Sequence, residues 1–514
     1  STLYGKVPFL KKFTSARGPR RPGTDQRGAS KDTDKGKDPD TPADSLDKPK
    51  VNYLAEVGKG LVGIVTGVKN ASISYMEGSG ILLPGFMPEP NAVGNNWSMN
   101  APGLGFVFGS QRDIRIPAVE NGWLSTDTLL NTAYATKYNQ TLNGRATIEP
   151  LPDLRIELTA NRNYSENHSE YFTANAEGVF TSSAPQTSGN FSISFLTWST
   201  AWEKQGSDHR SQNFENMKEY RQEIAMRLAN ANPNWDGTII DSTGFPKGYG
   251  PNSQEVLVPA FLAAYSGTSA ATISTDLFPQ IPLPNWRVSY NGLSRIKFFA
   301  KFLKSLNITH SYRSSYNIGS FQTNLLFEDE NGFPSAYNDI NNFISEYEIG
   351  QVSITEQFAP LINFDMQWHN SLLSRVEIKK SRSLSLSFVN NQLTEVTSDE
   401  FVLSLGYRFK DVQFTIRSMG GGGKKSRLKS DLNLKADLTI RNNKTVLRRL
   451  DEDLQQVSSG QRNIAIKSSA EYRVNDRTEI RLFYEQNILR PFISSQFPNS
   501  TTNAGISLRF TLAQ

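Results

Sequence analysis

Alternation of apolar and polar residues is the feature that most constrains how this chain can fold. In residues 153–160 (DLRIELTA) every second residue is apolar, and the residues between them are mostly charged. Successive side chains of a β-strand point to opposite faces, so this segment predicts a strand with one apolar and one charged face. Its apolar side holds Leu154, Ile156 and Leu158, and its charged side holds Arg155 and Glu157.

The same alternation recurs through the second half of the chain, in residues 401–409, 432–440, 464–472 and 506–512. The last of these segments carries Leu508, Phe510 and Leu512 on its apolar side. Shortly before it, Glu479 and Arg481 alternate with apolar residues. At about 10 residues per strand, the chain holds about 14 to 18 strands. We therefore predict an all-β, antiparallel fold.

Short and long connections alternate between the expected strands. We expect hairpin turns at residues 150–152, 380–381, 410–411 and 475–476, and long loops at residues 185–284, 323–346, 419–429 and 488–503. Short turns on one side and long loops on the other are typical of outer-membrane β-barrels. A soluble all-β sandwich has the same strand periodicity, but its apolar faces form a core.

The loop lengths favour an antiparallel transmembrane β-barrel segment located in the outer membrane. In such a barrel the apolar residues of each strand face membrane lipid, and the alternate residues face a polar lumen. The expected lipid-facing residues are Leu154, Ile156, Leu158, Leu508, Phe510 and Leu512. The expected lumen-facing residues are Arg155, Glu157, Glu479 and Arg481.

Composition agrees with a barrel and disagrees with a helical membrane protein. Only 37% of the residues are hydrophobic and 20% are charged, as expected where half of each strand faces a polar lumen. No run of the sequence approaches the roughly 18 apolar residues that a membrane-spanning helix needs. Residues 257–265 (LVPAFLAAY) form one of the longest apolar runs.

The chain divides into a charged N-terminal segment and a β-rich remainder. Residues 1–50 are rich in Lys, Arg, Asp, Gly and Pro, so we expect a disordered loop or linker there. Residues 51–514 form the expected barrel segment, with insertions at about 78–138 and 185–284. Two short helices are expected in these insertions, at residues 121–138 with Ser125 as cap and at residues 214–231. A start without Met or an apolar signal core favours a processed or truncated chain.

The sequence gives no support for an enzyme, a cofactor site or a metal site. There is no Cys, and the four His residues are too far apart in sequence to form a zinc-ligand pair. Residues 419–426 (MGGGGKKS) lack the spacing of a phosphate-binding loop, and the acidic run at 328–330 precedes an Asn-Gly turn. A net charge of +5 over 514 residues gives no reason to expect a nucleic-acid partner.

Residues 71–163 resemble the SprA/Sov family, the outer-membrane translocons of type IX secretion and gliding motility in Bacteroidota. The resembling segments are residues 72–75 (SISY), 80–85 (GILLPG), 101–115 (APGLGFVFGSQRDIR), 122–125 (GWLS), 130–131 (LN) and 145–158 (RATIEPLPDLRIEL). Within them, the family motif comprises Pro84, Gly85, Pro102, Gly103, Gly105, Phe106, Phe108, Gly109, Gln111 and Trp123. The rest of the chain resembles the family mainly in its hairpin rhythm.

The resemblance implies that the chain is the C-terminal part of a much larger barrel, which passes folded cargo proteins with C-terminal sorting domains to the cell surface. The implied partners are the N-terminal remainder of the same barrel, a plug protein, a PorV-type shuttle barrel, secreted cargo and membrane lipid. No catalytic residue and no cofactor are implied. Two alternatives stay open on the sequence: a self-contained outer-membrane porin or receptor barrel, and a soluble secreted all-β binding protein.

Overall fold

The computed structural model describes residues 67–206, 208–417, 425–452, 454–475, 477–493 and 497–511. The charged segment expected at residues 1–50 and the expected lipid-facing Leu512 lie outside these ranges. Within them, most residues belong to one antiparallel sheet of 14 strands, and the two other sheets have two strands each. The predicted all-β, antiparallel fold is therefore confirmed.

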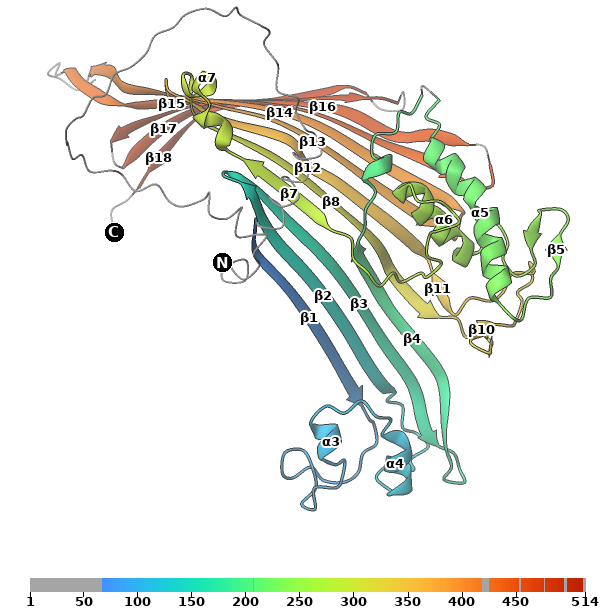
Figure 1. Cartoon of the computed structure of the whole chain (residues 1–514). Coiled ribbons are helices and arrows are strands. Elements are labelled where there is room, and N and C mark those ends of the chain that lie inside the picture. The colour runs from blue at the N-terminus through green and yellow to red at the C-terminus, as the bar shows by residue number, and fades with distance from the viewer. Residues whose placement is uncertain are drawn as a thin grey trace, which may run out of the picture.

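In the main sheet, each strand pairs with the next one along the chain, apart from one interruption. The order across the sheet is β1-β2-β3-β4-β8-β12-β13-β14-β15-β16-β17-β18, with β7 beside β3 and β8, and β11 beside β8. The strands are β1 (Val68–Leu82), β2 (Tyr134–Leu151), β3 (Leu154–Ala174), β4 (Phe180–Ser194), β7 (Asn285–Tyr290), β8 (Leu303–Thr323), β11 (Tyr347–Ile349), β12 (Gln351–Trp368), β13 (Leu372–Ser387), β14 (Gln392–Arg417), β15 (Lys425–Arg449), β16 (Gln455–Asn475), β17 (Thr478–Pro491) and β18 (Asn499–Phe510). Figure 1 shows them as one twisted, curved layer that runs from blue β1 to red β18.

The interruption is a strand that leaves the sheet and later returns to it. β4 pairs with residues 162–174 of β3, and β7 pairs with residues 154–159 of the same strand. On their other side, both β4 and β7 pair with β8. The two strands therefore share a single strand position, and the chain makes an excursion of residues 195–284 between them. The long loop expected to begin at residue 185 begins only after Ser194.

The excursion contains the two longest helices of the described residues, α5 (Gln212–Ala231) and α6 (Gln254–Ser266), with the short η3 (Trp198–Thr200) and the strand pair β5 (Ile239–Ile240) and β6 (Phe245–Pro246). α5 confirms the helix predicted at residues 214–231, and Ser211 caps it by accepting a hydrogen bond from the Phe214 amide at 3.2 Å. α6 was not predicted. Residues 256–265 of α6 are all buried, so they lack the polar side that gives a helix its sequence period.

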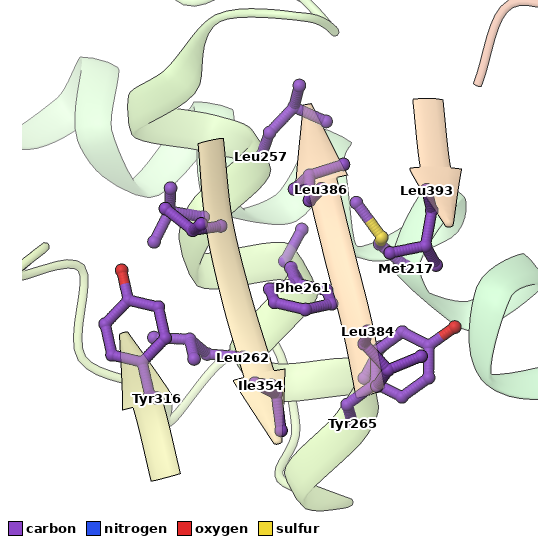
Figure 2. Packing of buried hydrophobic residues seen from close by; sticks show 14 of the residues in the cluster. Met217, Leu257, Phe261, Leu262, Tyr265, Tyr316, Ile354, Leu384, Leu386 and Leu393 are labelled. Carbon is purple, nitrogen blue, oxygen red and sulfur yellow. The ribbon is translucent and has the colours of Figure 1, made fainter. Parts of the chain in front are cut away.

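α5 and α6 pack on one face of the sheet and form its largest apolar core. Phe261 of α6 and Met217 of α5 are fully buried there. Figure 2 shows them over side chains of four sheet strands: Tyr316 of β8, Ile354 of β12, Leu384 and Leu386 of β13, and Leu393 of β14. We call the helices with the rest of the excursion, residues 195–284, the cap.

The helix predicted at residues 121–138 is wrong. Strand β2 begins at Tyr134, and the nearest helix is the short α4 (Arg115–Glu120). Leu129, which was expected to lie on the apolar side of that helix, is 84% exposed, so a helix here would have had little apolar surface to bury. Ser125 caps no helix, and its amide donates instead to the Gly85 carbonyl at 2.8 Å.

Two of the four predicted hairpin turns are wrong and two are confirmed. Residues 380–381 continue the ladder between β13 and β14, and residues 410–411 lie at a bulge within β14. The polar residues at 380–381 therefore continue a strand, and those at 410–411 mark a bulge, so neither pair reverses the chain. The turn at residues 150–152 is confirmed by the closing pair Leu151 with Leu154, and the reversal predicted at 475–476 is confirmed by the closing pair Asn475 with Thr478, although residue 476 itself lies outside the described ranges.

The remaining helices lie at opposite ends of the sheet. Residues 83–133 connect β1 to β2 and contain α3 (Leu104–Val107) and α4. At the other end, η4 (Gly292–Arg295) and α7 (Lys297–Ala300) connect β7 to β8. Figure 1 shows α3 and α4 beyond the lower ends of β1 and β2, with α7 at the top of the sheet. A further strand pair, β9 (Asp329–Glu330) with β10 (Phe333–Pro334), lies between β8 and β11.

Candidate functional site

The candidate site is the main sheet itself, whose two faces differ in chemistry. Residues paired directly across an antiparallel ladder point to the same face, so the register assigns every strand residue to one side. The row that joins Ile378, Phe401, Ile440, Ile464 and Ile488 crosses five strands on one face. The core residues Leu384 and Leu393 belong to the same face, because they lie an even number of residues from Ile378 and Phe401 in the same strands. We call this side the belt face and the opposite side the polar face.

An apolar belt runs across the end of the belt face that lies away from the cap. It comprises the alternate residues of 154–158, 372–378, 401–409, 432–440, 464–472, 480–488 and 506–510 that point to this face, nearly all of them apolar. Several stay bare even on interior strands: Leu405 is 42% and Leu482 is 49% exposed. In the described part of the chain, no second sheet lies over the belt.

The polar face behind the belt carries charged side chains in matched pairs. Asp365 lies 2.6 Å from Arg375, and Glu400 lies between Lys379 at 3.1 Å and Arg441. Farther along, Glu471 lies 3.5 Å from Arg481. These pairs follow one another from β12 to β17, so the face is hydrated but has little local excess of either charge.

The residues expected to face lipid and those expected to face the lumen lie on opposite faces of the sheet. Leu154, Ile156 and Leu158 lie on the belt face, because the same side of β3 carries Arg162, which is paired with core residue Ile193. Leu508 and Phe510 reach the belt face through their partners Ile480 and Thr478. The four charged residues lie on the polar face: Arg155, Glu157, Glu479 and Arg481. Arg155 and Glu157 form an ion pair at 2.7 Å.

Two buried ion pairs on the belt face hold the cap against the sheet. Arg382 of β13 lies 3.0 Å from Glu356 of β12, and Arg448 of β15 pairs with Glu395 of β14. All four side chains are at most 5% exposed. A buried ion pair needs further hydrogen bonds to its charged groups, and the cap supplies several of them, although the Nε atoms of Arg382 and Arg448 have no partner among the described residues.

The hydrogen bonds come from one segment of the cap, residues 197–209. Thr197 donates its hydroxyl to Glu356 at 2.6 Å, and Arg382 donates to the Thr200 carbonyl at 3.0 Å. At the second pair, Gln205 donates to Glu395 at 2.9 Å, and Arg448 donates to the His209 carbonyl at 2.6 Å. Sequence reasoning missed this arrangement, since the partners are separated by well over a hundred residues.

The family-motif residues lie in the connection between β1 and β2, beyond the end of the sheet. Gly85, Gly103 and Gly109 have positive φ angles, whereas Gly105 lies within α3 with Phe106. A Cβ at Gly85 would meet Leu130 at 2.9 Å, so the turn there requires glycine. The left-handed backbone at Gly103 and Gly109 bends the chain just before and just after α3.

The other motif residues support the same compact turn structure. Trp123 packs edge-on against Phe86, with ring centroids 6.1 Å apart, and its carbonyl accepts from the Met87 amide. Pro102 follows the buried Ala101, and Gln111 donates to the Gly109 carbonyl at 2.9 Å. Pro84 stands directly before the Gly85 turn, and Phe108 is exposed beyond α3. These contacts shape the connection and assemble no catalytic group.

Among the described residues, no group of three or more His, Asp or Glu side chains could hold a metal ion. None of the helices in the described ranges combines the length and apolar character needed to cross a membrane. No protein-family model and no curated protein matches the chain.

Proposed function

We propose that this sheet is an arc of an outer-membrane β-barrel, with the apolar belt against lipid and the polar face lining a protein-conducting pore. The observation that carries the proposal is the belt, which has a nearly constant height of nine residues on β14, β15, β16 and β17. Nine residues at about 3.4 Å each extend roughly 30 Å along a strand, and a membrane-spanning β-strand needs about 9–11. A soluble sandwich would cover these side chains with a second sheet.

The edges of the sheet support an arc in preference to a closed ring. In the described ranges, β1 and β18 each have one neighbouring strand and do not pair with each other. Unpaired backbone groups within lipid cost several kcal/mol each, so both edges require further strands. The N-terminal remainder of a larger barrel would supply them, which is the partner implied by the resemblance to the SprA/Sov family.

The polar face suits the passage of proteins. A pore that passes folded proteins needs a hydrated wall with few adhesive patches, and it needs no catalytic residue. The alternating acidic and basic pairs from Asp365 to Arg481 meet that need, because each charge is largely neutralised by its neighbour. We accordingly assign the chain to a type IX secretion translocon that passes cargo with C-terminal sorting domains, with a plug protein and a PorV-type shuttle barrel as partners.

Site-specific photo-crosslinking tests this function. A photoreactive amino acid replaces Arg481 on the polar face in one variant and Leu482 on the belt face in a matched neighbour. Secretion is then stalled with cargo that carries a bulky folded fusion before its sorting domain. We expect cargo adducts at position 481 and none at position 482.

Each other outcome has a definite meaning. Adducts at neither position, with the chain still in membranes, would favour a self-contained porin or receptor barrel. Recovery of the chain in buffer without detergent would overturn the membrane assignment and favour the soluble all-β alternative.

A further inference from the structure

A short basic and aromatic segment lies on the belt face where β7 turns into β8. Residues 292–304 (GLSRIKFFAKFLK) contain η4 and α7, and we call them the hinge segment. Phe298 is 69% and Phe302 is 47% exposed, and Ile296 is exposed beside them. Large apolar side chains on a turn between strands are exposed to water at a cost unless something apolar covers them.

The hinge segment continues the apolar belt. Together with β8 and β12 beneath it, the hinge segment borders a partly open pocket of about 340 Å³ lined by apolar and aromatic side chains. Phe299 and Phe302 line it from the segment, and Ile308, Phe364, Met366 and Trp368 line it from β8 and β12. These sheet residues point to the belt face, so the hinge segment lies at the belt's outer margin and not on the pore side.

Positive charge accompanies the exposed aromatic rings, and the Lys301 ammonium lies 5.6 Å from the centroid of the Phe302 ring. Lys297, Lys301 and Lys304 lie within the hinge segment, and no ion pair to them is present in the described residues. Arg295 is the exception, because it pairs with Asp153 at 2.8 Å. Trp368 contributes a further aromatic ring at this margin, with its indole nitrogen bonded to Ser374 at 2.8 Å.

We infer that the hinge segment is an interfacial lipid site, which inserts Phe298 and Phe302 among acyl chains and holds anionic phospholipid headgroups with Lys297, Lys301 and Lys304. Segments with exposed aromatic residues and adjacent Lys or Arg bind in the boundary between headgroups and acyl chains. Anionic headgroups complement the unpaired lysines, and the apolar pocket accepts part of an acyl chain. The inference rests on the proposed membrane location of the belt.

The absence of Cys from the sequence permits a clean depth measurement. Nitroxide labels are attached to Phe298→Cys, Leu508→Cys and Ile239→Cys, which lie in the hinge segment, the belt and the cap. The full chain, with everything that copurifies, is reconstituted in vesicles of phosphatidylcholine and phosphatidylglycerol. Collision with oxygen and with a water-soluble nickel complex then reports depth. We expect label 508 in the acyl-chain region, label 298 at the shallow boundary with the headgroups, and label 239 in water.

The two proposals fail in different ways. Label 508 in lipid with label 298 in water would overturn the lipid site and leave the barrel assignment intact. Water at both positions would overturn both. A label at 298 that is shielded from both oxygen and nickel would mean that a protein covers the segment, which also overturns the lipid site.

A charge variant tests the headgroup class. A fluorophore replaces the nitroxide at position 298, and its quenching by brominated lipids is measured. Brominated phosphatidylglycerol should quench it more strongly than brominated phosphatidylcholine. Each lysine near an anionic surface contributes about a five-fold preference, so Lys297→Gln, Lys301→Gln and Lys304→Gln together should remove most of it. The control Lys435→Gln with Lys467→Gln, on the polar face, should leave it unchanged. Equal quenching by both lipids in the unmodified segment would overturn the anionic assignment.

Discussion

The belt face carries large apolar side chains toward both ends of the sheet, but their exposure differs between the two ends. Toward one end, the belt leaves residues such as Leu405 and Leu482 bare. Toward the other, the cap buries Ile354, Leu384 and Leu386 completely. A protein bathed in one solvent would cover both ends or neither. Under the proposed function the two ends have different surroundings, with lipid beside the belt and water beside the cap.

The strongest test of this comparison places a carboxylate in the cap core. Phe261→Asp should lower the free energy of unfolding by more than about 4 kcal/mol, because it buries an unpaired charge. The control Phe261→Leu, which keeps the apolar contact, should cost about 1 kcal/mol. Urea unfolding in detergent micelles, followed by the tryptophan fluorescence of the cap, measures both. Similar unfolding midpoints for the two variants would show that the cap is loosely attached.

The buried ion pairs allow a sharper test of how the cap is held. Arg448→Met should cost about 3–5 kcal/mol, because Glu395 is left buried without its partner. The double variant Arg448→Met with Glu395→Leu should recover most of that loss. Arg481→Met, which breaks an exposed pair on the polar face, should cost at most about 1 kcal/mol. Equal effects of the two single variants would contradict the assignment of Arg448 to a buried anchor.

The bare belt is tested by a charge placed within it. Leu438→Arg should destabilise the protein in lipid vesicles by about 2–4 kcal/mol, or somewhat less if the side chain reaches the bilayer boundary. Its neighbour Thr439 points to the polar face, so Thr439→Arg should change the unfolding free energy by no more than about 0.5 kcal/mol. Folding yield in vesicles at increasing urea compares them. An unaffected Leu438→Arg protein would place the belt in water.

The smallest expected effect concerns the water-exposed side of the cap. A hydrogen bond from Lys247 at 2.9 Å lowers the pKa of Asp236 to about 2. A carboxyl with a lowered pKa in the folded state stabilises the fold above its unfolded pKa, near 3.8, and loses this contribution as the pH falls toward 2. Asp236→Asn should therefore shift cap stability slightly at pH 7 and not at all near pH 2, as read by urea midpoints at both pH values. A larger effect at pH 2 than at pH 7 would contradict this ion pair.

Much of the sheet could be predicted because its signal is local. Each strand of the belt has its own alternation of apolar and polar residues. That Leu154 and Ile156 share one face, and that Glu479 and Arg481 share the other, follows from β geometry alone. Turns were less predictable. Lys380 and Ser381 look like a reversal in sequence, but they continue a strand, with Lys380 on the belt face beside Trp202 of the cap, and only the pairing with β14 reveals this.

The cap and its anchors could not be predicted, for two physical reasons. α6 is buried on all sides, so its sequence has no helical period, and the apolar run at residues 257–265 was recognised only as too short to cross a membrane. Glu356, Arg382, Glu395 and Arg448 look like ordinary alternating strand residues. Their burial is decided by a segment far away in sequence. The Phe and Lys residues of the hinge segment are visible in the sequence. Only the fold shows that they lie at the margin of the belt.

Because β4 and β7 share one strand position, the cap is inserted into the main sheet at a single point of the sequence. β3 pairs Arg162 with Ile193 and Thr159 with Asn285, so Ser194 faces Asn161 and only Ala160 lacks a direct partner. A single residue spliced between Ser194 and Asn285 would therefore complete an unbroken strand of the same register. The ninety-residue excursion is therefore an insertion at one position of the ladder. A different domain could be inserted there without changing the register of the neighbouring strands.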